Sequence, residues 1–260
     1  MVLRCELPAS PAVTTAWEAV ERRQRAVAES YQLISQPDHA ELAGALAAKF
    51  VSPDFPALDA EMVRAIAQHD IGWAIFEPEA DPAAPPWVDA SGKPVSFVEL
   101  APAEFVRAWR ASIDNAEQIG AAGGIVVSAH FRRLCRHRLQ AGGDSDADTA
   151  VLRRFDEHEA DRQRRLRPIA SASDEELAAL LEVLQFCDLL SLYLCCGARE
   201  EVEFPQNFAA GKVRVWCEGD AFRLRPSSFP VQPVSVEVNA TRYERGSGRG
   251  NVSVLRFDVG

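Results

Sequence analysis

The sequence predicts a mainly α-helical protein: a helical bundle core that carries a small C-terminal antiparallel β-sheet, and thus an α+β protein overall. Over most of residues 1–200, apolar residues recur at steps of three and four, which is typical of amphipathic helices. From residue 201 onward they alternate with period two, which is typical of strands. The chain has 260 residues, of which 47% are hydrophobic and 25% charged, an ordinary globular balance. We therefore expect a helical domain over 1–200 with a β-rich appendage over 201–260 packed on it.

The expected helices follow from apolar spacing and from residues that cap helix ends. Asp38 and Glu41 have the spacing of a capping box, so a helix should run from there to about Phe50. Ser173 and Glu176 open another helix in the same way, and this one should reach about Cys196. Helical spacing also predicts helices over 11–30, 58–73, 102–118 and 151–167, and one that begins just after Gly124 and includes residues up to 134.

Strands are expected where short runs alternate between apolar and polar residues. The C-terminal runs are 212–216, 222–225, 234–238 and 252–257, separated by turn residues. The first nine residues alternate enough for a short strand that joins this sheet, and residues 31–35 look extended. A glycine-rich segment over 246–250 predicts a hairpin turn. Four prolines within 77–86 predict a loop, because proline lacks an amide donor and bars a helix.

Composition limits the classes of partner. A net charge of −10 argues against nonspecific binding to nucleic acid or to an anionic membrane. We find no apolar stretch near 18 residues and no charged-then-apolar leader, so we expect neither a membrane span nor secretion. The six cysteines show no C-x-x-C spacing, hence no zinc ribbon or disulfide framework. These features predict a cytoplasmic protein with reduced thiols.

Three helices each carry a ligand-type residue where a core residue is expected. In the helix over 58–73 the apolar stripe passes through His69, which is followed at once by Asp70. His39 lies near the start of the preceding helix, and Asp188 interrupts a leucine stripe late in the chain. A buried polar group is costly unless something binds it. We therefore expect His39, His69, Asp70 and Asp188 to hold one divalent metal ion.

The ligand chemistry suits several metals. Imidazole together with carboxylate binds divalent iron, manganese, zinc, magnesium or nickel, and the sequence does not distinguish them. A plainer interpretation stays open, in which His69 is a satisfied core histidine, Asp70 is exposed and Asp188 pairs with an arginine.

A further histidine is a candidate for proton transfer. Val127, His130 and Leu134 share one helix face, so His130 can face the metal as general acid, as hydrogen-bond donor to a ligand, or as an additional ligand. Four arginines are candidates to reach a small anionic substrate, although exposed arginines are common on amphipathic helices: Arg107, Arg110, Arg132 and Arg133. The sequence leaves the oligomeric state open.

Four spaced segments resemble a known superfamily. They are Gln36–Ala40, His69–Trp73, Ser128–His130 and Asp188–Leu192. In order and spacing they resemble the H…HD…D signature of the HD-domain superfamily of metal-dependent phosphohydrolases, and more narrowly a bacterial HD-like family of unknown function. The resemblance implies an all-helical core in which His39, His69, Asp70 and Asp188 hold a divalent ion. In characterised relatives that ion activates a water molecule against a phosphate ester.

The chain departs from the superfamily at two points. Members that act on cyclic dinucleotides often carry a lysine where this chain has Trp73, and an indole cannot replace that charge at a phosphate. A di-iron branch that uses oxygen needs extra histidines, for which His130 is the suitable residue here. Three functions therefore remain open: a phosphohydrolase, a di-iron HD-type oxygenase, and a metal- or ligand-binding protein without catalysis.

Overall fold

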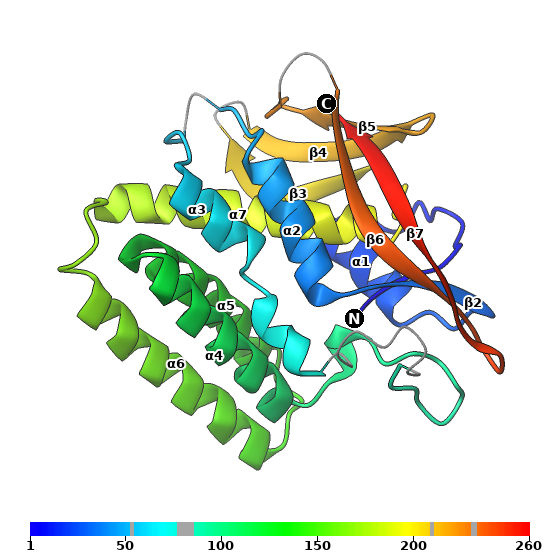
Figure 1. Ribbon diagram of the computed structural model, residues 1–260, viewed down its shortest axis with the longest axis horizontal. Coiled ribbons are helices and arrows are strands. Elements are labelled where there is room, and N and C mark those ends of the chain that lie inside the picture. The colour runs from blue at the N-terminus through cyan, green and yellow to red at the C-terminus, as the bar shows by residue number, and fades with distance from the viewer. Residues whose placement is uncertain (53–54, 77–85, 209–210, 230–232) are drawn as a thin grey trace.

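The computed structural model describes residues 1–52, 55–76, 86–208, 211–229 and 233–260 (Figure 1). Its α-helices are α1 (Ala16–Gln24), α2 (Gln36–Ala47), α3 (Ala60–Ala67), α4 (Pro102–Ile119), α5 (Ala121–Ala141), α6 (Asp146–Leu166) and α7 (Asp174–Cys195). Two 3₁₀ helices are η1 (Ile71–Phe76) and η2 (Phe97–Glu99). The strands are β1 (Val2–Arg4), β2 (Ser30–Ile34), β3 (Val202–Phe208), β4 (Gly211–Glu218), β5 (Ala221–Arg225), β6 (Val234–Glu244) and β7 (Gly248–Val259).

All seven strands form one curled, mixed sheet in the order β1-β2-β6-β7-β5-β4-β3. Strands β5 and β7 pair in parallel and the other neighbours pair antiparallel. The prediction of a mainly α protein with a small C-terminal antiparallel sheet is therefore wrong, and so is the description of its core as all-α. Helices make up 49% of the described residues and strands 22%.

The sheet is larger than expected because both ends of the chain supply strands. β2 pairs with β6 through residues that are more than 200 positions apart, such as Tyr31 with Tyr243. β1 and β2 have three and five residues, which is too short to show the period-two alternation of a strand. Only pairing with distant residues makes them part of the sheet. β3 was missed because Pro205 lies inside it. A strand can hold a proline at the edge of a sheet, which is where β3 lies.

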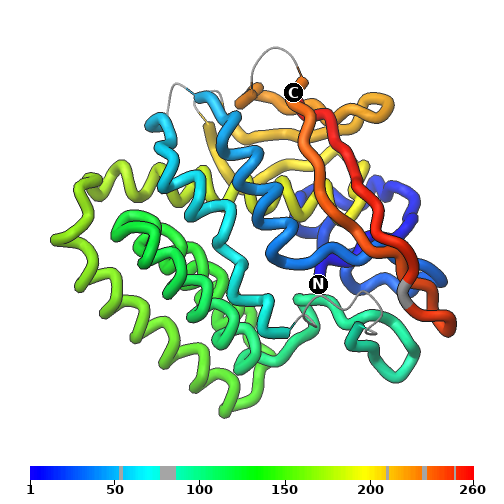
Figure 2. The backbone as a smooth tube through the Cα atoms, viewed as in Figure 1, coloured from blue at the N-terminus to red at the C-terminus, as the bar shows by residue number. Residues whose placement is uncertain are grey.

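Helices α2 and α7 lie between two outer layers, the sheet on one side and helices α4, α5 and α6 on the other (Figure 2). α2 contacts α7, α3 and β6, while α7 contacts α5, α1 and the strands β1 and β3. One hydrophobic core runs through these layers, from Phe155 on α6 through Phe186 on α7 to Val215 on β4. The expected boundary near residue 200 thus separates two stretches of sequence that share a core, and two strands lie before it.

Helix α7 is the central helix and differs from one sequence expectation. Its capping box at Ser173 and Glu176 and its end at Cys195 agree with the prediction. Among the described residues, it is the helix whose length and composition would also suit a membrane span. The prediction that the chain has no apolar stretch near 18 residues is therefore wrong. Of that apolar stretch 72% is buried inside the protein, as in a core helix. The loop expected over 77–86 lies, except for Pro86, outside the described residues.

Candidate metal centre

The first turn of α2 positions His39. Ser35, not Asp38 as expected, is the N-cap: its hydroxyl accepts a hydrogen bond from the Asp38 amide at 2.9 Å. Starting the helix at Gln36 places His39 on the face that packs against α3 and α7, where it is completely buried. A capping contact thus fixes which way this imidazole points.

His69 and Asp70 lie just beyond a helix rather than within one. α3 ends at Ala67, and the chain then tightens into η1, with the Ile71 amide donating to the Gln68 carbonyl at 3.1 Å. The prediction of a helix over 58–73 is therefore wrong at both ends. His69 nevertheless faces the core, because its Nδ1 donates to the Ile66 carbonyl at 2.8 Å. That bond leaves Nε2 of His69 free to face the other candidate ligands.

Two glycines allow the elements that carry these residues to approach closely. A Cβ atom at Gly44 would lie 2.3 Å from the Cβ of Ala67, so α2 and α3 pack against each other at a position without a side chain. A Cβ atom at Gly72 would lie 2.1 Å from the Ala108 carbonyl oxygen of α4. These contacts bring His39 beside the His69-Asp70 pair.

Side-chain atoms of His39, His69 and Asp188 form a cluster in which all three lie within 4.8 Å of one another. His69 Nε2 lies 3.3 Å from Asp188 Oδ1, and His39 Nδ1 lies 3.9 Å from the same oxygen. Both histidines are fully buried, whereas the Asp188 side chain is 13% exposed. Three segments separated by about 30 and about 120 residues thus meet at one point.

Asp70 lies at the side of this cluster. Its Oδ2 is 2.8 Å from His39 Nε2 and 3.7 Å from His69 Nε2. Its Oδ1 accepts a hydrogen bond from the indole nitrogen of Trp73 at 2.9 Å. Trp73, which the resemblance marks as a departure, therefore orients a candidate ligand instead of meeting a phosphate.

Ser191 is a contact that the sequence reasoning missed. Its hydroxyl donates to the Asp188 carbonyl at 2.7 Å, so toward His39 Nδ1, 2.9 Å away, it can only accept. His39 Nδ1 must then carry a proton. The signal was present in the sequence, because Asp188 and Ser191 are three residues apart on one helix face.

The protonation of His39 decides what lies between it and Asp70. With a proton on Nδ1, neutral His39 presents a lone pair to the Asp70 carboxylate at 2.8 Å. At this distance two atoms that both carry lone pairs repel each other. A cation must therefore lie between them, either a second proton on the ring or a metal ion.

His130 completes the group from α5. Its Nε2 is 3.8 Å from Asp188 Oδ2, and its ring lies 5.5 Å from the ring of His69. The imidazole is buried, and its Nδ1 has no hydrogen-bond partner among the described residues. Of the five residues predicted for the site, His39, His69 and Asp188 form the cluster, and Asp70 and His130 lie beside it.

Burial and the charges of the cluster shift three pKa values. Burial alone would lower the pKa of His69, but the carboxylates of Asp70 and Asp188 outweigh it and raise the pKa to about 9. Burial would raise the pKa of Asp188, but the facing histidines, His69 foremost, lower it to about 2. For His130 burial dominates and lowers the pKa to about 4. Without a metal, His69 is thus protonated at pH 7 and His130 is neutral.

The donor set fits a divalent cation. Ligand bonds of about 2.0–2.2 Å put neighbouring ligand atoms of one ion about 3 Å apart. His39 Nε2 and Asp70 Oδ2 are 2.8 Å apart, and His69 Nε2 and Asp188 Oδ1 are 3.3 Å apart. Two carboxylates and neutral imidazoles carry a charge of −2, which is costly to bury without a cation. His69 Nε2 is buried and makes no well-aligned hydrogen bond in the described part of the chain, and the Asp188 carboxylate faces it at 3.3 Å, so a metal ion would satisfy both groups.

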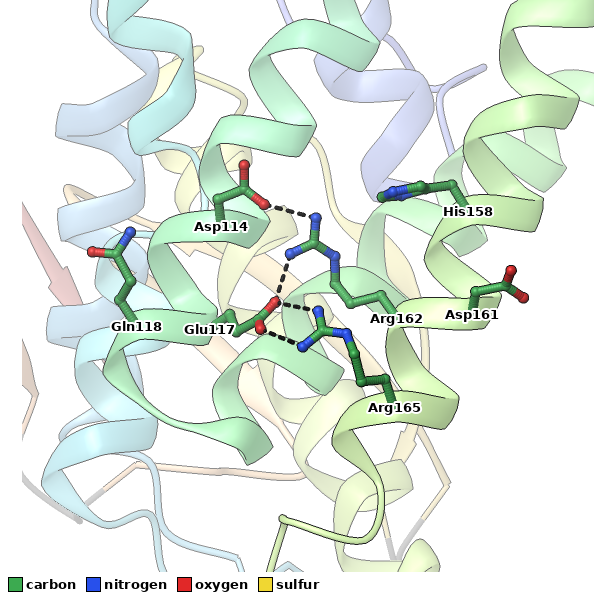
Figure 3. Close-up of a pocket in the computed structure, with 7 residues that line it drawn as sticks. All are labelled: Asp114, Glu117, Gln118, His158, Asp161, Arg162 and Arg165. Atoms are coloured by element: carbon green, nitrogen blue, oxygen red, sulfur yellow. Dashed lines mark hydrogen bonds and ion pairs between the residues drawn. The ribbon is translucent and has the colours of Figure 1, made fainter.

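A cavity of about 710 Å³ lies elsewhere, between α4 and α6 (Figure 3). It is lined by Asp114, Glu117, Gln118, His158, Asp161, Arg162 and Arg165. Arg162 bonds both Asp114 and Glu117, and Arg165 bonds Glu117 (Figure 3). Because these charges neutralise one another, we do not assign this cavity a ligand.

Fold and cluster together define an α+β protein with a buried histidine–aspartate centre built by segments from three regions of the chain. A family model described as "Protein of unknown function (DUF3891)" matches residues 24–244, and the chain belongs to that family. The matched span contains His39, His69, Asp70, His130 and Asp188. No curated protein and no solved structure matches the chain.

Proposed function

We propose that this protein binds a divalent metal ion through His39, His69, Asp70 and Asp188 and hydrolyses a phosphate ester, as the resemblance to HD-domain phosphohydrolases suggests. The observation that carries the proposal is the meeting of two imidazoles and a carboxylate from distant segments within 4.8 Å of one another. A second carboxylate, that of Asp70, adds negative charge beside them.

Each group of the chain has a part in this chemistry. A bound divalent ion supplies a water molecule of lowered pKa and neutralises phosphoryl charge. The two carboxylates and His39 and His69 hold the ion, while Trp73 and Ser191 orient Asp70 and His39. With a pKa of about 4, His130 is neutral at pH 7. It therefore acts as a hydrogen-bond donor or proton acceptor rather than as a protonated general acid.

The side chains that reach solvent indicate where a substrate enters. Asp70 and Asp188 are 10% and 13% exposed, whereas the histidines are closed off. An ester would therefore approach from the side of the carboxylates.

The first test is elemental analysis of protein purified without added metal or chelator. We expect one divalent ion per chain, and release of phosphate from an ester such as p-nitrophenyl phosphate that stops with chelator and returns with metal. Asp188→Asn should lose both metal and activity. His158→Ala, which alters a histidine that is 56% exposed on α6, serves as the matched control and should keep both. Metal-free protein, or hydrolysis that persists in Asp188→Asn, would contradict the proposal.

The position of His130 favours a second candidate, a di-iron oxygenase. A third imidazole with an unpartnered, buried Nδ1 beside Asp188 is the kind of extra ligand that a second ion needs. Two irons per chain with visible absorption would support this function. One tightly bound ion without turnover of any ester would instead support a binding protein.

A further inference from the structure

We propose that Arg133 binds the phosphoryl group of the substrate, and that the substrate is a small phosphomonoester. The proposal deepens the function proposed above and rests on it. It begins from where α5 and α7 place their polar residues relative to the candidate metal centre.

Helices α5 and α7 meet in two successive polar contacts. In the first, His130 faces Asp188 across the helix pair, with Nε2 3.8 Å from Oδ2. In the second, Arg133 donates to Gln185, which is buried and lies three residues before Asp188. Three residues along a helix correspond to a rise of about 4.5 Å. Arg133 therefore contacts α7 about one helical turn before Asp188.

The Arg133 side chain reaches solvent, although its partner Gln185 is buried. The side chains of Arg133 and of its other partner, Glu182, are 42% and 36% exposed, whereas His130 is 2% exposed. Glu182, Gln185 and Asp188 follow one another at steps of three residues along one face of α7. A charged ligand that moves along this face toward Asp188 passes Arg133.

Two of the other three candidate arginines, Arg132 and Arg107, contact residues outside the centre. Arg132 bonds Asp156 and Gln163 of α6. Arg107 lies over the ring of Phe76, 5.3 Å from its centre. Of Arg107, Arg132 and Arg133, it is Arg133 that bonds α7 beside the site.

The ion-pair partner of Arg133, Glu182, can give way to a substrate. Its ion pair with Glu182, at 2.7 Å, is exposed, and pairs of this kind contribute only about 0–1 kcal/mol. The planar guanidinium offers a fork that binds two phosphate oxygens at once. A monoester has three unesterified oxygens, two for this fork and one for the metal. A diester has only two, which is why we infer a monoester.

The test uses the metal-loaded protein and two esters, p-nitrophenyl phosphate and bis(p-nitrophenyl) phosphate. For Arg133→Gln we expect unchanged metal content, a KM for the monoester raised tenfold or more, and a much smaller effect on the diester. Arg133→Lys should recover only part of the loss, since it keeps the charge but not the fork. Arg136→Gln removes an exposed arginine from the same helix, bonded to Asp156, and should behave as the unaltered protein.

Binding of inorganic phosphate, measured by calorimetry, separates this proposal from the function on which it rests. If no ester is hydrolysed, tenfold weaker phosphate binding by Arg133→Gln still supports the role of Arg133. If phosphate binds Arg133→Gln as well as the unaltered protein, or binds neither, the role of Arg133 is overturned, whether or not esters are hydrolysed.

Discussion

Ser191 Oγ lies 2.9 Å from His39 Nδ1 and leaves that nitrogen no role except as donor. The serine proton is donated to the backbone carbonyl of Asp188, so one hydroxyl fixes the tautomer of His39 and is bonded to the main chain of another residue of the candidate centre. The contact leaves Nε2, which faces Asp70 Oδ2 at 2.8 Å, as the nitrogen of His39 that a metal ion would use.

Replacing Ser191 with alanine should weaken metal binding while leaving the four ligands in place. Loss of a hydrogen-bond partner behind a ligating histidine costs about 10–100-fold in metal affinity. The measurement is competition with a chromophoric chelator. Ser96→Ala is the control, since it removes an equally buried hydroxyl bonded to Gln24 on another part of the chain. Equal affinity in Ser191→Ala and Ser96→Ala would show that the tautomer of His39 does not matter.

Trp73→Phe should also reduce metal affinity, by about tenfold. The ring still packs against Phe76 and Phe105, but the indole N–H that holds Asp70 Oδ1 at 2.9 Å is lost. The same chelator competition measures it, with Trp216→Phe on β4 as the control. If the two variants bind metal alike, Asp70 is oriented without Trp73.

Gly44→Ala should destabilise the protein by about 1–3 kcal/mol, the usual cost of overpacking. The new Cβ would meet the Cβ of Ala67 at 2.3 Å and push α2 from α3, against a helix-propensity gain of about 1 kcal/mol. The melting temperature and the metal content should fall together. Gly250→Ala, whose nearest neighbour would be at 3.4 Å, is the control. A stable, metal-loaded Gly44→Ala protein would contradict this account of helix packing.

The metal-free protein should lose stability between about pH 6.5 and pH 9. The pKa of His69 is raised in the folded state to about 9, so its charged form stabilises the fold below the unfolded pKa of 6.5, and this contribution disappears as the pH rises through 9. The loss is at most about 3 kcal/mol. Melting temperatures of chelator-treated protein across this range measure it. His69→Gln should flatten the profile, and a profile as steep as that of the unaltered protein would assign the effect to another group.

The sequence predicted the site better than the fold. A histidine or aspartate on an apolar stripe is visible in sequence, because a buried polar group contradicts its neighbours, and His39, His69 and Asp188 were found in this way. Whether the cluster binds metal stays a prediction. Ser191 was missed because a buried serine contradicts nothing until its partner is known.

The sheet could not be predicted in the same way. β1 and β2 are short, and their membership depends on pairing with β6 across the length of the chain. The close approaches at Gly44 and Gly72 were also invisible, because they depend on Ala67 and Ala108, which the sequence does not mark as their neighbours.

The pairing of β2 with β6 also sets the order in which the molecule can be completed during synthesis. Strands made first must wait, unpaired along one edge, until residues 241–244 have left the ribosome. α2, which carries His39, contacts both α7 and β6, so the layer that holds the candidate centre is covered last. We expect a nascent chain that stops near residue 200 to expose the edge of β2 and the apolar side of α7, and to need protection from aggregation until the final strands arrive.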